Sequence, residues 1–248
     1  AIDKQRLPNQ VNKNLFDLSL TEEQQMTVDA MSQFAEEVLY ALAHDADHQA
    51  RFPEQLWQHL VDLGLNYYAL PEALGGVAAE QNIVSNILIA ESLAKGDFSL
   101  TAGLLSTFSI INAITRWGST QVQSMYLPVF AEDTDVTATF AFQEATPAFN
   151  PYQLKTKATE QNGQMTITGE KTLVILGDTA DVFLVSAEFN GQPDIFFVQA
   201  NETIAIKANP AMGLKAAETA TLQFNQTPAL RLGDTDFDYT AFVDLGTL

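Results

Sequence analysis

Apolar residues in the first half of the chain recur every three or four positions, which is the spacing of one face of a helix. Thr21 and Gln24 form a capping-box pattern, which predicts that the first helix begins here. We expect this helix to run for roughly 25 residues with one buried face. Its expected apolar positions are Met26, Ala30, Met31, Phe34, Ala35, Val38, Leu39 and Leu42.

Four further helices are predicted before the pattern changes. A short one begins at Pro53 and ends at Gly64, because proline favours the first helical turn and glycine favours the C-terminal cap. The others are expected over 80–94, 99–116 and 119–126, the last closed by Pro128. The 99–116 segment is apolar nearly all round, which predicts a helix buried inside a larger body or against a partner.

The second half of the chain alternates between apolar and polar residues, as half-buried strands do. Strands are predicted over 136–142, over 153–160, through Gly169-Glu170-Lys171, and over 181–188, 194–198, 203–207 and 219–224. Asn162-Gly163 and Asn190-Gly191 each lie between two of these strands, and Asn-Gly is a strong signal for a hairpin turn.

Helices followed by strands, without alternation of the two, indicate segregated layers rather than a parallel α/β fold. We therefore predict an α+β chain of two domains. An all-α N-terminal helical domain spans residues 1–133, and a β-barrel or β-sandwich domain spans residues 134–248.

The charge balance excludes some partners. Asp and Glu number 31 against 12 Lys and Arg, a net charge of −19, so nucleic acid and anionic membrane surfaces would meet like charge. The chain has no cysteine, which removes disulfides, thiolate metal sites and thiol nucleophiles. We find no apolar run approaching ~20 residues and no leader pattern, so we expect no membrane span and a cytoplasmic protein.

Common catalytic and metal-binding sequence motifs give little support for a specific function in this sequence. His44 and His48 are four residues apart, a spacing that can share a metal, but a solvated helix end explains them better and no metal site is predicted. The chain has no G-x-S-x-G nucleophile elbow, no G-x-G-x-x-G after a strand and no Walker loop. Hydrolase, Rossmann and P-loop functions are therefore not supported.

Short motifs in order along residues 20–230 resemble those of the acyl-CoA dehydrogenase family. Each is weak alone, but together in register they are specific. They are Leu20-Thr21-Glu22-Glu23-Gln24, Leu63-Gly64-Leu65 with Pro71-Glu72 and Gly75-Gly76, Ala90-Glu91-Ser92-Leu93-Ala94, Gly118-Ser119 with Tyr126-Leu127-Pro128, Thr168-Gly169-Glu170-Lys171, Ala180-Asp181, and Met212-Gly213-Leu214 with Thr219 and Phe224.

The resemblance implies FAD as cofactor and an acyl-CoA thioester as substrate, with α,β-dehydrogenation as the reaction. Family motifs that contact the flavin fall on two strand ends here. The implied cofactor-binding residues are Phe140, Phe142, Gln143, Leu173 and Ile175, with Glu144 beside them. The implied substrate-binding residues are Phe149 and Asn150, and we add Leu105 and Phe108 of the apolar helix as acyl-facing positions.

Three of the family's ligand contacts depart from its pattern in this sequence. A tryptophan and a threonine at the flavin become Leu173 and Ile175, and a Gly-Ser pair becomes Ala148-Phe149. No acid in this sequence matches the family's catalytic glutamate, which lies in a C-terminal helical domain, so we name no catalytic residue and expect no turnover of acyl-CoA by this polypeptide alone.

Two functions remain open from the sequence. One is an acyl-CoA dehydrogenase-like flavoprotein, incomplete as given or with an altered flavin site. The other is a degenerate, non-catalytic homologue that acts as a binding or interaction module. In both cases we expect a homo-oligomer or a partner chain that covers the exposed apolar surface.

Overall fold

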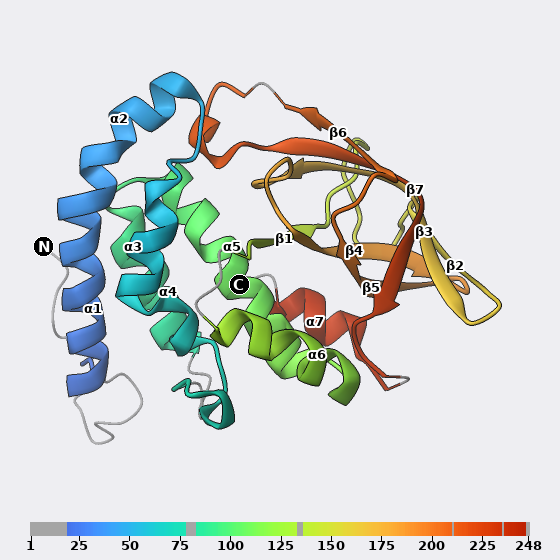
Figure 1. Ribbon diagram of the computed structural model, residues 1–248, viewed down its shortest axis with the longest axis horizontal. Coiled ribbons are helices and arrows are strands. Elements are labelled where there is room, and N and C mark those ends of the chain that lie inside the picture. Colours follow the sequence, from blue (N-terminus) through green and yellow to red (C-terminus); the bar gives the residue numbers. More distant parts are fainter. Residues whose placement is uncertain (1–18, 78–82, 133–135, 210, 235, 247–248) are drawn as a thin grey trace, which may run out of the picture.

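The computed structural model describes residues 19–77, 83–132, 136–209, 211–234 and 236–246. Helices gather at one end of the molecule and strands at the other, with α5 between them (Figure 1). The helices are α1 (Glu22–Phe34), a π-helical turn (Ala35–Leu39), α2 (Tyr40–Gln49), α3 (Gln55–Leu63), α4 (Ile83–Ala94), α5 (Phe98–Trp117), α6 (Thr120–Ala131) and α7 (Tyr239–Gly246).

The start of α1 is confirmed in detail. The Gln24 backbone amide donates to Thr21 Oγ1, and the Thr21 amide donates to Gln24 Oε1, both at 3.1 Å. The predicted face was partly wrong, because Met31, Ala35 and Leu39 are buried whereas Met26 is exposed. The helix packs against α4 along the Met31 face, so Met26 lies outside that contact.

The helix ends follow the predicted caps with two exceptions, the first being that α3 begins at Gln55 with Glu54 as its N-cap and not at Pro53. Gly64 closes α3 in the left-handed conformation at φ 67°, as its position predicts. Pro128 does not end α6, which continues to Ala131 with the proline inside it. Leu127 and Phe130 are buried on either side, and this packing outweighs the cost of an interior proline, typically about 3 kcal/mol.

Helix α5 forms the centre of the molecule and contacts α4, α6, α7 and β1. It is confirmed as a buried helix, with eleven of its residues buried. By length and apolar composition α5 could also cross a membrane, contrary to the expectation that no apolar run approaches ~20 residues, but 67% of its apolar window is buried inside the fold. Its apolarity is therefore accounted for by packing.

The strands close into a barrel, which decides between the two predicted architectures. They are β1 (Ala138–Ala141), β2 (Lys157–Gln161), β3 (Gln164–Val174), β4 (Val182–Phe189), β5 (Gln192–Gln199), β6 (Ile204–Ala208) and β7 (Ala220–Arg231). The strands form a closed ring through the pairings β4–β5, β5–β7, β7–β3, β3–β2 and β2–β4. Outside this ring, β1 pairs with β4 and β6 pairs with β7. The α+β class is confirmed, and the β part is a barrel.

Both Asn-Gly turns are confirmed. Asn162 and Gly163 join β2 to β3 with φ of 54° and 78°, and Asn190 and Gly191 join β4 to β5 with φ of 53° and 81°. Several strand limits differ from prediction: β1 is shorter than 136–142, β2 begins at Lys157 rather than 153, and β7 extends to Arg231 rather than 224. The extension of β7 is stabilised because its residues 227–229 pair with β3 and Leu230 and Arg231 pair with β5.

The apolar core has two parts that share strand β4. Val182 and Leu184 point toward the helices, while Phe183 and Val185 point into the barrel, as the alternation of a strand requires. On the helix side of the core a buried polar contact joins β1 to α5, since the Ala138 amide donates to Thr107 Oγ1 at 3.0 Å. The domain limits at 133 and 134 stay a prediction, and residues 133–135 lie outside the described residues.

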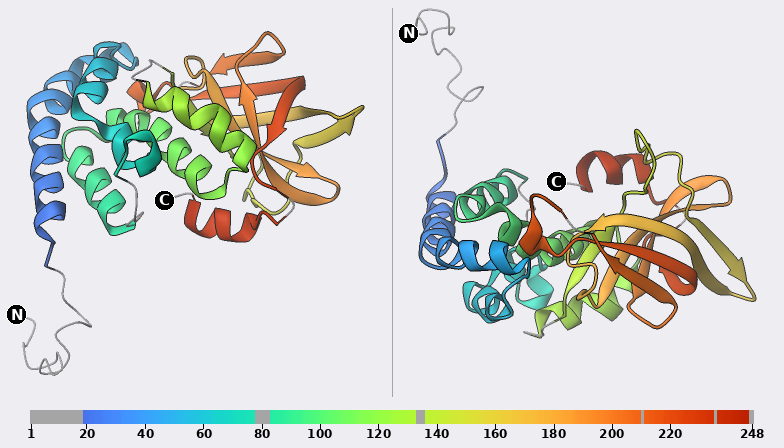
Figure 2. Two further views of the ribbon diagram at one scale, coloured as in Figure 1. Left: turned by 60° about the horizontal axis from the view of Figure 1, so that its bottom comes forward. Right: turned by 90° about the horizontal axis from the view of Figure 1, so that it is seen from above.

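Helix α7 lies at the junction of helices and strands. It contacts α5 and β5, and Figure 2 shows it in dark red on the outside of the fold. The C-terminal end of the described chain is thus packed against the part of the fold where β1 meets the helices.

Candidate functional site

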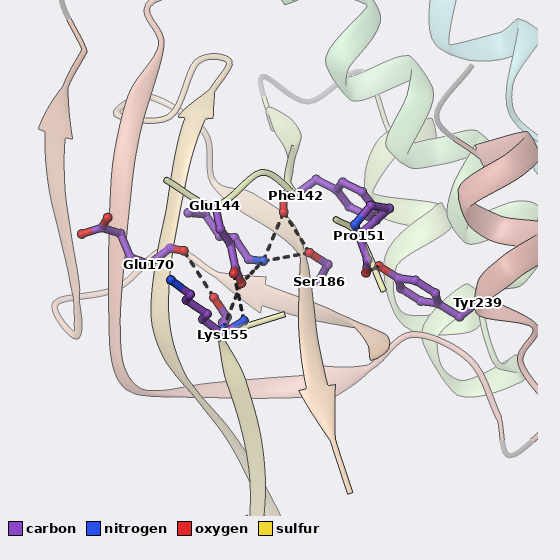
Figure 3. Close-up of polar contacts among 9 residues, drawn as sticks. Phe142, Glu144, Pro151, Lys155, Glu170, Ser186 and Tyr239 are labelled. Carbon is purple, nitrogen blue, oxygen red and sulfur yellow. Dashed lines mark hydrogen bonds and ion pairs between the residues drawn. The ribbon is translucent and has the colours of Figure 1, made fainter. Parts of the chain in front are cut away.

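The segment between β1 and β2, residues 142–156, is held by a buried polar cluster (Figure 3). At its start is Glu144, whose carboxylate accepts from the backbone amides of Lys155 at 2.8 Å and Thr156 at 2.9 Å. One side chain therefore joins both ends of the segment. We call residues 145–154 the site loop.

Lys171 of β3 completes this cluster from the barrel side. Its Nζ donates to Glu144 Oε1 at 3.0 Å, to Ser186 Oγ at 2.9 Å and to Phe142 O at 3.1 Å. Ser186 Oγ donates in turn to Phe142 O at 3.1 Å. Lys171 and Ser186 are fully buried and Glu144 nearly so, so each charge has its partner and its hydrogen bonds inside the protein.

The pKa values of the pair reflect both burial and pairing. Burial alone raises the pKa of Glu144, but the Thr156 and Lys155 amides and the Lys171 charge outweigh it and leave the pKa below its usual value. Burial lowers the pKa of Lys171 to about 8, and the Glu144 carboxylate opposes this shift only in part. The pair is therefore ionised at pH 7.

The cluster requires a glycine at position 169, one residue before Glu170, because a side chain there would collide with Thr156. Its φ is 149°, in the region that favours glycine, and a Cβ there would lie 2.6 Å from the Thr156 Cα. β3 can thus approach Thr156, which follows the site loop, closely. This approach allows Thr156 to present its amide to Glu144 while its hydroxyl donates to Glu170 O at 3.3 Å.

The predicted cofactor residues are brought together at two neighbouring strand ends. The Thr172 amide donates to Gln143 O at 2.8 Å, which joins the end of β1 to the end of β3. Leu173 sits in a β-bulge with φ 55°, and its side chain is 50% exposed. Ile175 is half-buried and Gln143 is exposed. The structure thus forms one edge from residues 30 positions apart in the chain.

Aromatic rings cover the other side of this edge. Phe142 and Phe149 meet edge to face with their centroids 6.1 Å apart, so the substituted Phe149 packs on the strand end. The Phe140 ring faces Phe242 of α7, also at 6.1 Å. Phe140 therefore points toward α7 rather than toward the exposed edge at Leu173.

The remaining predicted substrate residues differ in how far they are exposed to solvent. Asn150 is exposed on the site loop, where its Oδ1 accepts from the Tyr152 amide at 3.0 Å. Leu105 is half-buried on α5, whereas Phe108 is buried in the core. The roles of these side chains toward a ligand stay predictions.

A cleft of about 920 Å³ lies next to the site loop, between the β4–β5 turn and the start of α7. Tyr152 and Tyr239 line one side, and the ion pair of the buried Asp194 with the half-buried Arg231 lies on the other at 2.5 Å. Burial raises the pKa of Asp194, although the Ile195 amide and the Arg231 charge act against it. The cleft gives solvent access to the loop from the α7 side.

Part of this site was not predicted from the sequence. Glu144 and Lys171 lie within the family motifs but were not paired, and neither Ser186 nor Tyr239 was predicted. A lysine at an inward position of a strand was the available signal for a buried partner, since lysine is almost never fully buried alone.

Comparison with known proteins agrees with this fold. Sequence models of the acyl-CoA dehydrogenase N-terminal domain and middle domain match residues 21–134 and 139–227. Cyclohex-1-ene-1-carbonyl-CoA dehydrogenase of Geobacter metallireducens is 30% identical over 168 residues, which are 68% of this chain and 44% of that protein. The chain spans about half the length of the curated relatives it matches.

Solved structures show the same architecture. Butyryl-CoA dehydrogenase from Megasphaera elsdenii has a TM-score of 0.78 at 25% identity, over 88% of this chain and 60% of that one. The FAD complex of PigA has a TM-score of 0.81 at 21% identity, over 92% of this chain and 62% of that one. With both domain models matched in order across most of its length, this chain belongs to the acyl-CoA dehydrogenase family.

Proposed function

We propose that this chain forms the flavin- and thioester-binding part of an acyl-CoA dehydrogenase-like flavoprotein, which desaturates an acyl-CoA thioester between its α and β carbons. The observation that carries the proposal is the edge at which Gln143 and Leu173–Ile175 are joined by the Thr172 hydrogen bond. Family membership and the enzymes similar to this chain support the reaction class.

The residues at this edge fit the flat ring system of a flavin. Leu173 and Ile175 offer apolar contact, and the exposed Gln143 amide can both donate and accept hydrogen bonds to the polar end of the ring. The PigA neighbour, which is an FAD complex, supports this cofactor. When bound, FAD would supply the two-electron oxidation, while these residues would bind and orient it.

Glu144 is close to this edge but is not suited to remove a substrate proton. Its two oxygens accept three hydrogen bonds, and its lowered pKa makes it a weak base. We therefore assign Glu144 to holding the site loop. Among the residues that the structure describes, we assign no catalytic base.

A pair of matched variants tests the flavin site. L173N removes apolar contact at the edge, and asparagine tolerates the left-handed backbone of this position better than leucine does. I206N makes the same change on β6, where Ile206 is 43% exposed and outside the proposed site. We expect L173N to weaken FAD binding at least roughly tenfold, the effect of losing about 1.4 kcal/mol, and I206N to leave it unchanged. Equal affinities for both variants would contradict the proposal.

A non-catalytic homologue is the second candidate. It is favoured by Leu173 and Ile175 at positions where the family has tryptophan and threonine, and by Phe149 packed against Phe142 where the family has a small residue. A flavin would lose an aromatic contact and a hydroxyl donor there. Wild-type protein that binds butyryl-CoA but no FAD would select this candidate.

We also infer that the chain acts as a homo-oligomer or with a partner chain. Apolar side chains are exposed on α4 and at the start of α5, with Ile83, Ile87 and Phe98 between 43% and 63% exposed. Light scattering on the eluting peak of a gel-filtration column would measure the mass. A monomer at all concentrations would argue against the homo-oligomer.

A further inference from the structure

Helix α7 reaches the site loop through one hydroxyl group. Tyr239 Oη donates to Pro151 O at 2.8 Å, and the two residues are 88 positions apart in the chain (Figure 3). The Tyr239 ring also meets the Tyr152 ring edge to face, with centroids 5.9 Å apart. The first turn of α7 therefore contacts two consecutive residues at the middle of the loop.

The Tyr239 hydroxyl is held as a donor. Its side chain is nearly buried, with 7% of the residue exposed. Burial raises the pKa of Tyr239, and nearby Tyr152, Asp194 and Glu144 raise it further. The hydroxyl therefore stays protonated at any pH near neutral. Because proline has no amide hydrogen, the carbonyl is the hydrogen-bonding group through which Pro151 can be fixed.

Pro151 is enclosed by hydrogen bonds of its neighbour Asn150. Asn150 Oδ1 accepts from the Tyr152 amide, and Asn150 O accepts from the Gln153 amide, both at 3.0 Å. Both bonds span Pro151, so Asn150, Pro151 and Tyr152 are tied into one tight turn. A shift of the Pro151 carbonyl would consequently shift Asn150 and, one residue earlier, Phe149.

The loop is thus fixed at two separate places. Glu144 holds its ends against the barrel, and Tyr239 holds its middle against α7. The same helix places Phe242 against Phe140 of β1. Helix α7 contacts both the strand end and the loop that carry the predicted ligand-binding side chains.

We propose that Tyr239 is a positioning residue for the thioester site: its hydroxyl fixes Pro151 and thereby sets where Phe149 and Asn150 meet the bound acyl thioester. This inference rests on the proposed function, because it concerns the substrate of that same site. Tyr239 acts through the loop and need not touch the ligand itself.

The test is Y239F in the full chain, with Y152F as the matched control. Y239F removes one hydroxyl and keeps the ring, whereas Y152F removes a hydroxyl from the partner ring, which is 44% exposed. Amide hydrogen exchange of residues 145–154 is measured together with the affinity for butyryl-CoA. We expect loop exchange to rise roughly three- to tenfold in Y239F, as loss of one hydrogen bond allows, and to stay unchanged in α1.

Affinity separates positioning from a merely structural role. Y239F should weaken butyryl-CoA binding several-fold, and N150A combined with Y239F should cost less than the sum of the two single changes, because both act on one turn. Y152F should leave both readouts near wild type.

Two failures can be told apart. Unchanged loop exchange in Y239F, in a protein that binds butyryl-CoA normally, overturns the role of Tyr239 and leaves the proposed function intact. Wild-type protein that binds neither FAD nor butyryl-CoA overturns the proposed function, and the positioning role falls with it.

Discussion

Replacing Lys171 by methionine isolates the charge that balances Glu144. Methionine has a similar length and no charge, so K171M keeps most of the packing while removing three hydrogen bonds from Nζ. Ser186 Oγ can still donate to Phe142 O. The principal result is a buried carboxylate that has lost its counter-charge.

The size of the effect follows from what Glu144 retains. Removing one partner of a buried ion pair typically costs about 3–5 kcal/mol, because the other charge stays uncompensated. Glu144 keeps the amides of Lys155 and Thr156, so we expect the lower end, about 3 kcal/mol. In a domain of this size, such a loss lowers the melting temperature by roughly 6–12 °C.

Urea unfolding of wild type, K171M, E144Q and the double variant measures this directly. The double variant should be more stable than the sum of the single changes predicts, by at least about 1 kcal/mol, because its uncharged amide no longer needs Lys171. A loss below about 1 kcal/mol in K171M, or strict additivity in the double variant, would refute the account of the pair.

Three further predictions concern the same region. Because the pKa of Lys171 is lowered to about 8, the unfolded chain binds more protons than the folded one between pH 8 and pH 10.5. The free energy of unfolding of wild type relative to K171M should therefore rise by up to about 3 kcal/mol across that window. A difference that does not change with pH would contradict the burial of a charged Lys171. G169A should cost about 3 kcal/mol or more, because its Cβ meets the Thr156 backbone, whereas G163A, also at positive φ but with open space around it, should cost only about 1 kcal/mol; equal losses by urea unfolding would argue against the close approach. T107V should cost about 1–3 kcal/mol by leaving the Ala138 amide without its acceptor, and S106A, which affects a bond within α5 alone, should cost less; the reverse order in thermal melts would count against the α5–β1 contact.

Local signals in the sequence were sufficient for much of the fold. The Thr21 capping box, the Gly64 cap and both Asn-Gly turns depend on residues close in sequence, and all four are confirmed. Pro128 misled because its local cost is outweighed by the burial of Leu127 and Phe130, which depends on distant neighbours.

The site was less predictable because distant segments build it. Glu144 and Lys171 are 27 residues apart, and nothing local to either indicates that they meet. Tyr239 lies 88 residues from Pro151 and belongs to a helix that no sequence motif predicted. The motifs placed the strand ends, but the bulge that turns Leu173 outward depends on the register of β3 against β7.

The most direct test of the central claim is a visible absorbance spectrum of the purified wild-type chain, taken after incubation with FAD and removal of free cofactor by gel filtration. Binding at the edge formed by Gln143, Leu173 and Ile175 predicts a flavin band that elutes with the protein and is reduced in L173N but retained in I206N. A colourless protein that gains no band from added FAD would contradict the flavoprotein assignment and would leave a family scaffold with a non-redox function.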